Sequence, residues 1–276
     1  MRLVTVATHS DGYFPFLVKS CERNGAKLDV LGWGQKWQGY AWKLVLMKEF
    51  LRGLDDDEVV CFIDAYDVLL LRPLEELEAA FRDFARATGC EIVVGCDNVR
   101  KMHMKFLSKW VFGTCQHRPI NSGTYIGFAG AIRRTVDKIG SIAQDPSQND
   151  QVLLTQYCRR GAHRMHIDCD NVFFLTVLDP LAPFMDGSMH VENGQLFHHG
   201  LRPFVVHGNG NTDMNDVIVK LGYDFVAEDM RALDQFHRVA VKNKLQNYFP
   251  YFINLLACIV GLCIAFLVAK KLVKRT

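Results

Sequence analysis

The sequence has no pair of cysteines at CxxC spacing, although it contains nine cysteines. An odd number of cysteines without a recognisable framework argues against a disulfide scaffold and against a structural zinc site. We therefore expect most of the cysteines to be buried free thiols.

The N-terminus lacks the apolar run of a signal peptide. Residues 1–8 contain one basic residue, and the polar residues His9, Ser10 and Asp11 follow at once. A signal peptide needs an apolar region of about 7–15 residues. We expect Leu3–Ala7 to form the first strand instead.

The chain also lacks an excess of charge of either sign. Its formal net charge is +2, and no segment concentrates basic residues as a nucleic-acid-binding face does. We therefore expect no nucleic-acid partner.

Short apolar runs alternate with segments of helical periodicity, which predicts a mostly parallel sheet flanked by helices, an α/β fold. The expected strands are Leu3–Ala7, Leu28–Leu31, Val59–Ile63, Glu91–Gly95, Tyr125–Ala129, Met165–Ile167 and Phe204–His207. The expected helices are Phe14–Arg23, Trp42–Leu51, Leu74–Arg86, Ala131–Ile142 and Asn149–Arg159. The basic, aromatic segment Asn98–Phe112 is expected to be a helix or a lid, with a solvated helix as the simpler alternative.

The C-terminus carries a long uncharged stretch. Residues 248–269 contain no charged side chain, and basic segments precede it at 236–247 and follow it at 270–276. Because about 20 apolar residues cross a bilayer core, we expect one transmembrane helix at 248–269, a buried core helix being the alternative. A lone C-terminal helix indicates a catalytic domain on the cytosolic side, although the flanking charges leave a lumenal orientation open.

Two carboxylates follow the apolar strand Val59–Ile63. Asp64 and Asp67 stand at its carboxyl end, where open α/β sheets bind ligands, and Tyr66 between them offers a ring or hydroxyl to a nucleoside. Oxygen ligands at this spacing suit Mg²⁺ or Mn²⁺. A pair of acids that only caps the turn is the alternative.

A second apolar strand ends in His207, followed by Gly208, Asn209 and Gly210. His207 is a suitable third ligand beside Asp64 and Asp67. The two glycines allow the backbone to approach a phosphate closely. A structural histidine is the alternative.

Two weaker motifs complete the set. The small polar residues Asn121, Ser122 and Gly123 precede a strand, as expected where a sugar lies against the backbone. Asn149 and Asp150 stand at a helix start, where either residue could cap the helix or Asp150 could face the sugar or the acceptor hydroxyl.

In this order the motifs resemble the glycosyltransferase domain of the procollagen lysyl hydroxylases, the collagen lysyl glucosyl- and galactosyltransferases, which has the GT-A fold. The resemblance covers about residues 1–235 and also includes the Val6-Ala7-Thr8 strand, the Trp37-Gln38-Gly39 loop and Lys43. It departs at Asn149, where the family has a second aspartate. We expect no hydroxylase part, because too few residues follow residue 235 to form one, and the C-terminal membrane segment is not part of the family's pattern.

The resemblance implies a UDP-sugar donor, Mn²⁺ and transfer with retention of anomeric configuration. It implies that Asp64, Asp67 and His207 bind the metal and that Asn149 and Asp150 lie at the transferring sugar. The residues it places around the nucleotide are Val6, Thr8, Trp37, Lys43 and Tyr66.

We therefore predict a GT-A-like domain at 1–235 that transfers glucose or galactose from a UDP-sugar to a hydroxyl of a glycan or protein. In this hypothesis Asn121, Gly208 and Gly210 also line the donor site, and Lys43 neutralises the diphosphate. The alternatives are a non-catalytic protein of the same fold that binds a sugar nucleotide or glycan, and a nucleotide-diphosphate hydrolase.

Overall fold

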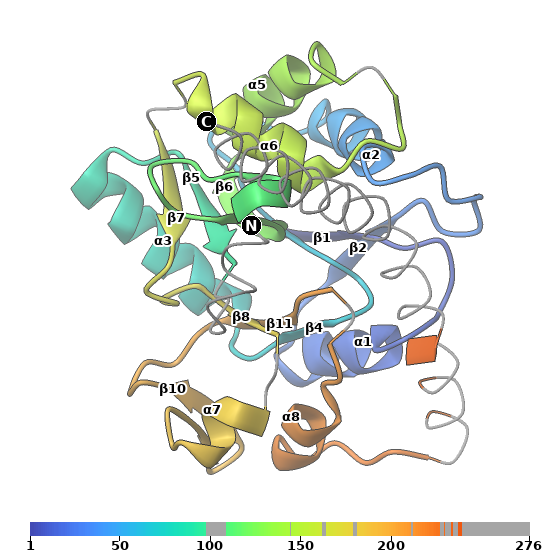
Figure 1. Ribbon diagram of the computed structural model, residues 1–276, viewed down its shortest axis with the longest axis vertical. Coiled ribbons are helices and arrows are strands. Elements are labelled where there is room, and N and C mark those ends of the chain that lie inside the picture. The colour runs from blue at the N-terminus through green and yellow to red at the C-terminus, as the bar shows by residue number, and fades with distance from the viewer. Residues whose placement is uncertain are drawn as a thin grey trace, which may run out of the picture.

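A computed structural model of the chain describes residues 1–97, 109–143, 145–161, 164–178, 181–210 and 212–226, together with 229, 233, 237 and 238. A six-stranded sheet forms its centre, with helices on both faces (Figure 1). A smaller unit of short strands and helices adjoins one end of this sheet. The candidate site lies between the two.

The central sheet has the strand order β2-β1-β3-β6-β5-β7. β6 is antiparallel to both of its neighbours, and the other pairs are parallel. This confirms the predicted mixed, mostly parallel α/β sheet. Its strands are β1 (Arg2–Val6), β2 (Leu28–Leu31), β3 (Val59–Ile63), β5 (Ile92–Cys96), β6 (Ile120–Phe128) and β7 (Met165–Asp168).

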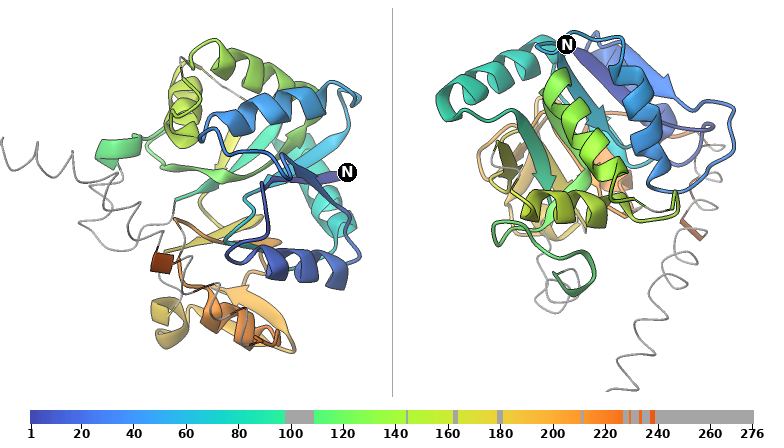
Figure 2. Two further views of the ribbon diagram at one scale, coloured as in Figure 1. Left: turned by 90° about the vertical axis from the view of Figure 1, so that its right-hand side faces the viewer. Right: turned by 90° about the horizontal axis from the view of Figure 1, so that it is seen from above.

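The helices cover both faces of this sheet because its strands are apolar on both sides (Figure 2). In β3, Val60 and Phe62 pack toward α2, α5 and α6, whereas Val59, Cys61 and Ile63 pack toward α1 and α3. The helices are α1 (Phe14–Arg23), α2 (Trp42–Leu51), α3 (Leu74–Thr88), α5 (Ala129–Gly140), α6 (Asp150–Arg159), α7 (Leu181–Met185) and α8 (Asn215–Lys220).

A second sheet of three short strands has the order β4-β11-β8. It contains β4 (Val68–Leu70), β8 (Phe174–Val177) and β11 (Val205–Gly208), and the hairpin β9 (Met189–Glu192) and β10 (Gln195–His198) lies beside α7. β4 follows β3 after a four-residue turn, so this turn joins the two sheets. A third apolar cluster holds the smaller unit together.

The sequence predicted the bounds of α1, α2, β2 and β3 correctly, and most other predicted elements end within about two residues of the observed ones. The exception is β6, which begins at Ile120 and not at Tyr125, because Asn121, Ser122 and Gly123 are part of the strand. The elements that the sequence did not predict are β4, β8, β9, β10, α7 and α8.

The expectation that most cysteines are free thiols was wrong for the described part of the chain. Cys96 is bonded to Cys169, and Cys115 to Cys158. Three free thiols remain there, all of them buried. The partners lie 73 and 43 residues apart in the sequence, so adjacent strands and a helix bring them together and no local spacing could reveal them.

The predicted transmembrane helix at 248–269 and its basic flanks at 236–247 and 270–276 lie almost entirely outside the described residues, as do residues 98–108 of the predicted lid. Among the helices that the structure does describe, none is both long and apolar enough to span a bilayer.

Candidate functional site

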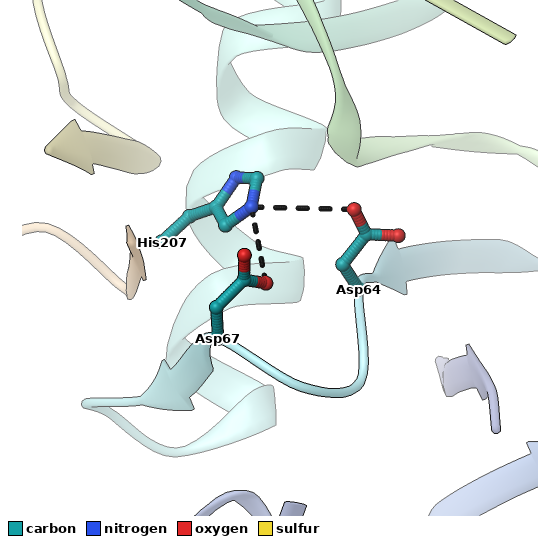
Figure 3. A group of neighbouring side chains, drawn as sticks. All are labelled: Asp64, Asp67 and His207. Atoms are coloured by element: carbon teal, nitrogen blue, oxygen red, sulfur yellow. Dashed lines mark ion pairs between the residues drawn. The ribbon is translucent and has the colours of Figure 1, made fainter. Parts of the chain in front are cut away.

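Asp64, Asp67 and His207 come together at the junction of the two sheets (Figure 3). Asp64 follows β3, Asp67 precedes β4, and His207 lies on β11 opposite Val68 of β4. One ligand atom from each of the three side chains lies within 4.8 Å of the other two. His207 Nε2 is 3.3 Å from Asp67 Oδ1 and 4.0 Å from Asp64 Oδ2.

Hydrogen bonds fix the orientation of the His207 ring. The side-chain oxygen of Asn121 accepts the backbone N–H of Gly123 at 3.0 Å and lies 3.1 Å from His207 Nδ1. Because this oxygen can only accept, Nδ1 carries a proton, and Nε2 faces the two aspartates. Such a bond to the second ring nitrogen is the usual way in which proteins orient a metal-binding histidine.

The backbone around the three side chains is also tied together. Asp64 N–H donates to the carbonyl of Gly123 at 2.8 Å, and Gly208 N–H donates to the carbonyl of Asp67 at 2.7 Å. A Cβ atom on Gly123 would lie 2.6 Å from Asp64 Oδ2 and would also clash with the ring of His207. The site therefore requires glycine at this position.

His207 is almost fully buried, with 2% of its surface exposed. Burial by itself lowers the pKa of the imidazole, but the nearby carboxylates Asp67 and Asp64 outweigh this effect, so the pKa is raised. The site therefore favours bound positive charge, either a proton on His207 or a metal cation.

Lys43 of α2 places a second positive charge beside these residues. Its ammonium lies 3.0 Å from Asp64 Oδ1 and 2.7 Å from Asp150 Oδ2. Burial lowers the pKa of Lys43, but Asp150 and Asp64 raise it more, so the lysine stays protonated. Mostly apolar side chains, among them Phe62 and Leu154, line a small cavity next to the Lys43–Asp150 pair.

Asn149 and Asp150 have different roles at the start of α6. The side chain of Asn149 accepts the backbone N–H of Val152 at 3.1 Å, which makes Asn149 the N-cap of the helix. The capping role that the sequence left open is thus confirmed for Asn149. Asp150 points to Lys43 and so lies next to the Asp64 side of the site.

The end of β1 is joined to the acidic turn through Tyr66. The hydroxyl of Tyr66 accepts the backbone N–H of Thr8 at 3.1 Å and donates to the carbonyl of His9 at 3.3 Å. Val6 and Thr8 are buried beside it. The structure therefore brings the predicted nucleotide-binding residues Val6, Thr8 and Tyr66 into one region at the end of β1.

Trp37 lies on the loop that leads into α2 and is 42% exposed. Its ring packs edge-on against Trp42 and Tyr40, with ring centroids 5.7 and 5.9 Å away. None of these ring contacts links Trp37 to Tyr66.

The turn after His207 contains both predicted glycines. Gly208 has no room for a Cβ, which would lie 2.6 Å from the sulfur of Met214. Gly210 has a φ of +68°, which favours glycine.

Asp97 was not predicted as a site residue, and Asn209 was named only as part of the turn after His207. Asp97 follows β5 at the same sheet edge as Asp64, is only 4% exposed, and accepts a hydrogen bond of 2.9 Å from the side-chain nitrogen of Asn209. An acid directly after an apolar strand is the pattern that identified Asp64. The same signal was present at Asp97.

The chain is similar in sequence to a known protein family. The family model described as the PLOD GT domain matches residues 1–224. The chain is 28% identical over 231 residues to human procollagen-lysine,2-oxoglutarate 5-dioxygenase 2, covering 77% of this chain and 30% of the relative. It is 26% identical over 235 residues to the multifunctional procollagen lysine hydroxylase and glycosyltransferase LH3 of Rattus norvegicus, covering 78% of this chain and 30% of the relative.

Among solved structures, a glycosyltransferase involved in the glycosylation of the major capsid of PBCV-1 aligns with 80% of this chain and 97% of its own. Its TM-score is 0.48 and its sequence identity 11%. The family assignment depends on the sequence match. The chain spans less than a third of the length of its curated relatives and belongs to the PLOD GT domain family, the glycosyltransferase-type domains of the procollagen lysyl hydroxylases.

Proposed function

We propose that this domain transfers glucose or galactose from a UDP-sugar to a hydroxyl of a glycan or protein, in the manner of GT-A glycosyltransferases and with retention of configuration. The observation that carries the proposal is the convergence of Asp64, Asp67 and His207 beside the buried Lys43. The oxygens of a diphosphate need positive charge close by. A cation held by Asp64, Asp67 and His207 can supply it from one side, and the ammonium of Lys43 from another.

The three side chains fit a divalent cation. Two carboxylates and an imidazole whose Nε2 faces them form a donor set suited to Mn²⁺, and Mg²⁺ is the second choice. Such an ion, when bound by Asp64, Asp67 and His207, supplies Lewis-acid stabilisation to the departing UDP.

Lys43 neutralises further charge on the diphosphate. In the structure its ammonium is bonded to Asp64 and Asp150. When Asp64 binds a cation, its charge is shared with that cation, so the ammonium of Lys43 can turn to a phosphate oxygen without leaving Asp64 uncompensated. Fixed charges of this kind provide most of the rate enhancement in such sites.

Asp150 is placed to accept hydrogen bonds from hydroxyls of the transferring sugar. Asn149 caps the helix that presents Asp150 and so keeps this carboxylate in place. Because an amide fills the capping position as well as a carboxylate does, the departure from the family at Asn149 is compatible with transfer.

The nucleoside would lie at the end of β1. There the half-buried Tyr66 lies beside the buried residues Val6 and Thr8, and the exposed ring of Trp37 offers a further surface for the base. The turn with Gly208 and Gly210 exposes backbone next to the predicted diphosphate position. Asn121 acts indirectly, by holding His207.

Mn²⁺-dependent release of the nucleoside diphosphate from a panel of UDP- and GDP-sugars tests the proposal, and we expect release of UDP from a UDP-hexose. A transferase releases UDP and passes the hexose to a hydroxyl acceptor. A non-catalytic binding protein releases nothing, and a nucleotide-diphosphate hydrolase yields a sugar phosphate instead of UDP.

We also propose that the domain resides in an oxidising compartment, on the lumenal side of a membrane. Two disulfides in the described part of the chain support this location, since disulfides persist where thiols are oxidised. This proposal replaces the cytosolic orientation expected from the sequence. Membrane attachment through residues 248–269 remains a prediction from the sequence.

A further inference from the structure

The loop in front of α2 has a rigid backbone. Gly39 has a φ of +119°, and a Cβ on it would lie 2.7 Å from the Cα of Ser147. The N–H of Ala41 donates to the carbonyl of Pro146 at 3.0 Å. Gly39 and Ala41 therefore both contact the loop that leads into α6, and Tyr40 lies between them in the sequence.

Tyr40 is close to the charged residues Lys43, Asp150 and Asp64. It stands three residues before Lys43, and the N–H of Lys43 donates to its carbonyl at 3.3 Å, so the two residues belong to one turn of the chain at the start of α2. Burial raises the pKa of the Tyr40 hydroxyl, and among the charges that act on it are those of Lys43, Asp150 and Asp64. The hydroxyl is thus a neutral hydrogen-bonding group within electrostatic reach of these residues.

The ring of Tyr40 is accessible and supported on one side. The side chain is 44% exposed, and its ring meets that of Trp37 almost at right angles, at 83°. Trp37 in turn packs against the buried Trp42. An open aromatic ring on a rigid loop therefore lies beside polar groups that can bond to hydroxyls.

We propose that Tyr40 packs against the hexose of the UDP-sugar and makes the site bind a UDP-hexose more tightly than UDP. This inference rests on the proposed function. The C–H face of a pyranose is apolar and fits an aromatic ring, while the hexose hydroxyls reach Asp150. Tyr40 is then a specificity-determining residue for the sugar. The nucleotide is held by Val6, Thr8 and Tyr66 and by Trp37, which keeps its contact with Trp42 when Tyr40 is truncated.

Binding of UDP, UDP-glucose and UDP-galactose in the presence of Mn²⁺, measured by calorimetry on the purified full chain, tests the inference. For Tyr40→Ala we expect roughly tenfold weaker binding of the UDP-hexose that the wild type prefers, since an aromatic contact contributes about 1.4 kcal/mol. We expect UDP affinity within about twofold of the wild type, because truncating an exposed side chain leaves the nucleotide contacts in place. Tyr40→Phe keeps the ring and should retain most of the preference for the UDP-hexose.

Trp33→Ala is the matched control, because Trp33 is an exposed aromatic residue of the same loop whose ring packs on Phe14. Its ratio of UDP-hexose to UDP affinity should equal that of the wild type. An equal loss for UDP and UDP-hexose in Tyr40→Ala, or no loss for either, would overturn the inference while leaving the proposed function standing. A wild type that binds neither UDP nor a UDP-hexose would remove the proposed function, and the inference with it. A normal thermal unfolding profile of Tyr40→Ala, together with the result for Tyr40→Phe, separates loss of contact from misfolding.

Discussion

Lys43 and Asp150 form a buried ion pair, with 2.7 Å between Nζ and Oδ2 and each side chain 10% exposed. The pair joins the first turn of α2 to the first turn of α6 and places a positive charge beside Asp64. The two helices are thus positioned by the same residues that we assign to the donor site.

Replacing Lys43 by methionine should lower the free energy of unfolding by about 3 kcal/mol, because Asp150 then remains buried without a counter-charge. Urea denaturation measures the change. Lys48→Met is the matched control, since the pair of Lys48 with Asp137 is about half exposed and its loss should cost under about 1 kcal/mol. Equal effects of the two substitutions would contradict the account of a buried pair.

Replacing Gly123 by alanine should weaken Mn²⁺ binding at least tenfold and leave the fold intact. The added methyl group meets His207 and Asp64, so these two side chains must separate. Calorimetric titration with Mn²⁺ measures the affinity. Gly53→Ala is the control, because a Cβ there meets no atom within 4 Å. An unchanged Mn²⁺ affinity in Gly123→Ala would show that the site binds no metal in this arrangement.

Stability of the metal-free protein should depend on pH through His207. Its pKa is raised from 6.5 in the folded state, so the folded protein holds the proton more tightly than the unfolded chain does. The stabilisation is fully present below about pH 6.5 and is lost as the pH rises through the folded-state pKa. The stability difference between wild type and His207→Gln should therefore shrink from pH 6 to pH 9 in the presence of a chelator.

Urea midpoints at several pH values measure this trend. A difference that grows with pH would mean that His207 is not paired with Asp67 and Asp64. With Mn²⁺ present the trend should reverse, since binding to the metal requires the neutral imidazole and becomes stronger as the pH rises.

The disulfide between Cys115 and Cys158 should contribute about 4 kcal/mol of stability, given the sequence separation of 43 between its cysteines. The double variant Cys115→Ser/Cys158→Ser should lose this amount in urea denaturation, and Cys61→Ser, at a buried free thiol, serves as the control for a cysteine change alone.

Mass spectrometry of unreduced peptides should find Cys96 linked to Cys169 and Cys115 linked to Cys158. Unlinked peptides from protein expressed in an oxidising compartment would contradict the proposed location.

The sequence predicted the central sheet and its helices well, because these elements have strong local signals. Val59–Ile63 is uniformly apolar, and Trp42–Leu51 follows helical periodicity. The start of β6 was missed because Asn121 and Gly123 look like loop residues. They are tolerated in a buried strand because Asp64 and His207, both distant in sequence, satisfy their hydrogen bonds.

The three proposed metal-binding residues were predictable from two strand ends, but their distances were not. His207 reaches the acids only because β11 pairs with β4, a three-residue strand with too little periodicity to be recognised. The contact of Lys43 with both Asp64 and Asp150 likewise depends on tertiary structure, because it joins the start of α2 to the end of β3 and the start of α6.

The most direct test of the central claim is release of UDP from UDP-glucose and UDP-galactose by the full chain, with and without Mn²⁺, compared with Asp67→Asn. The account predicts release by the wild type that needs Mn²⁺ and a loss of at least a hundredfold in Asp67→Asn, because Asp67 is one of three residues that hold the ion. Full, metal-independent release by Asp67→Asn would contradict it.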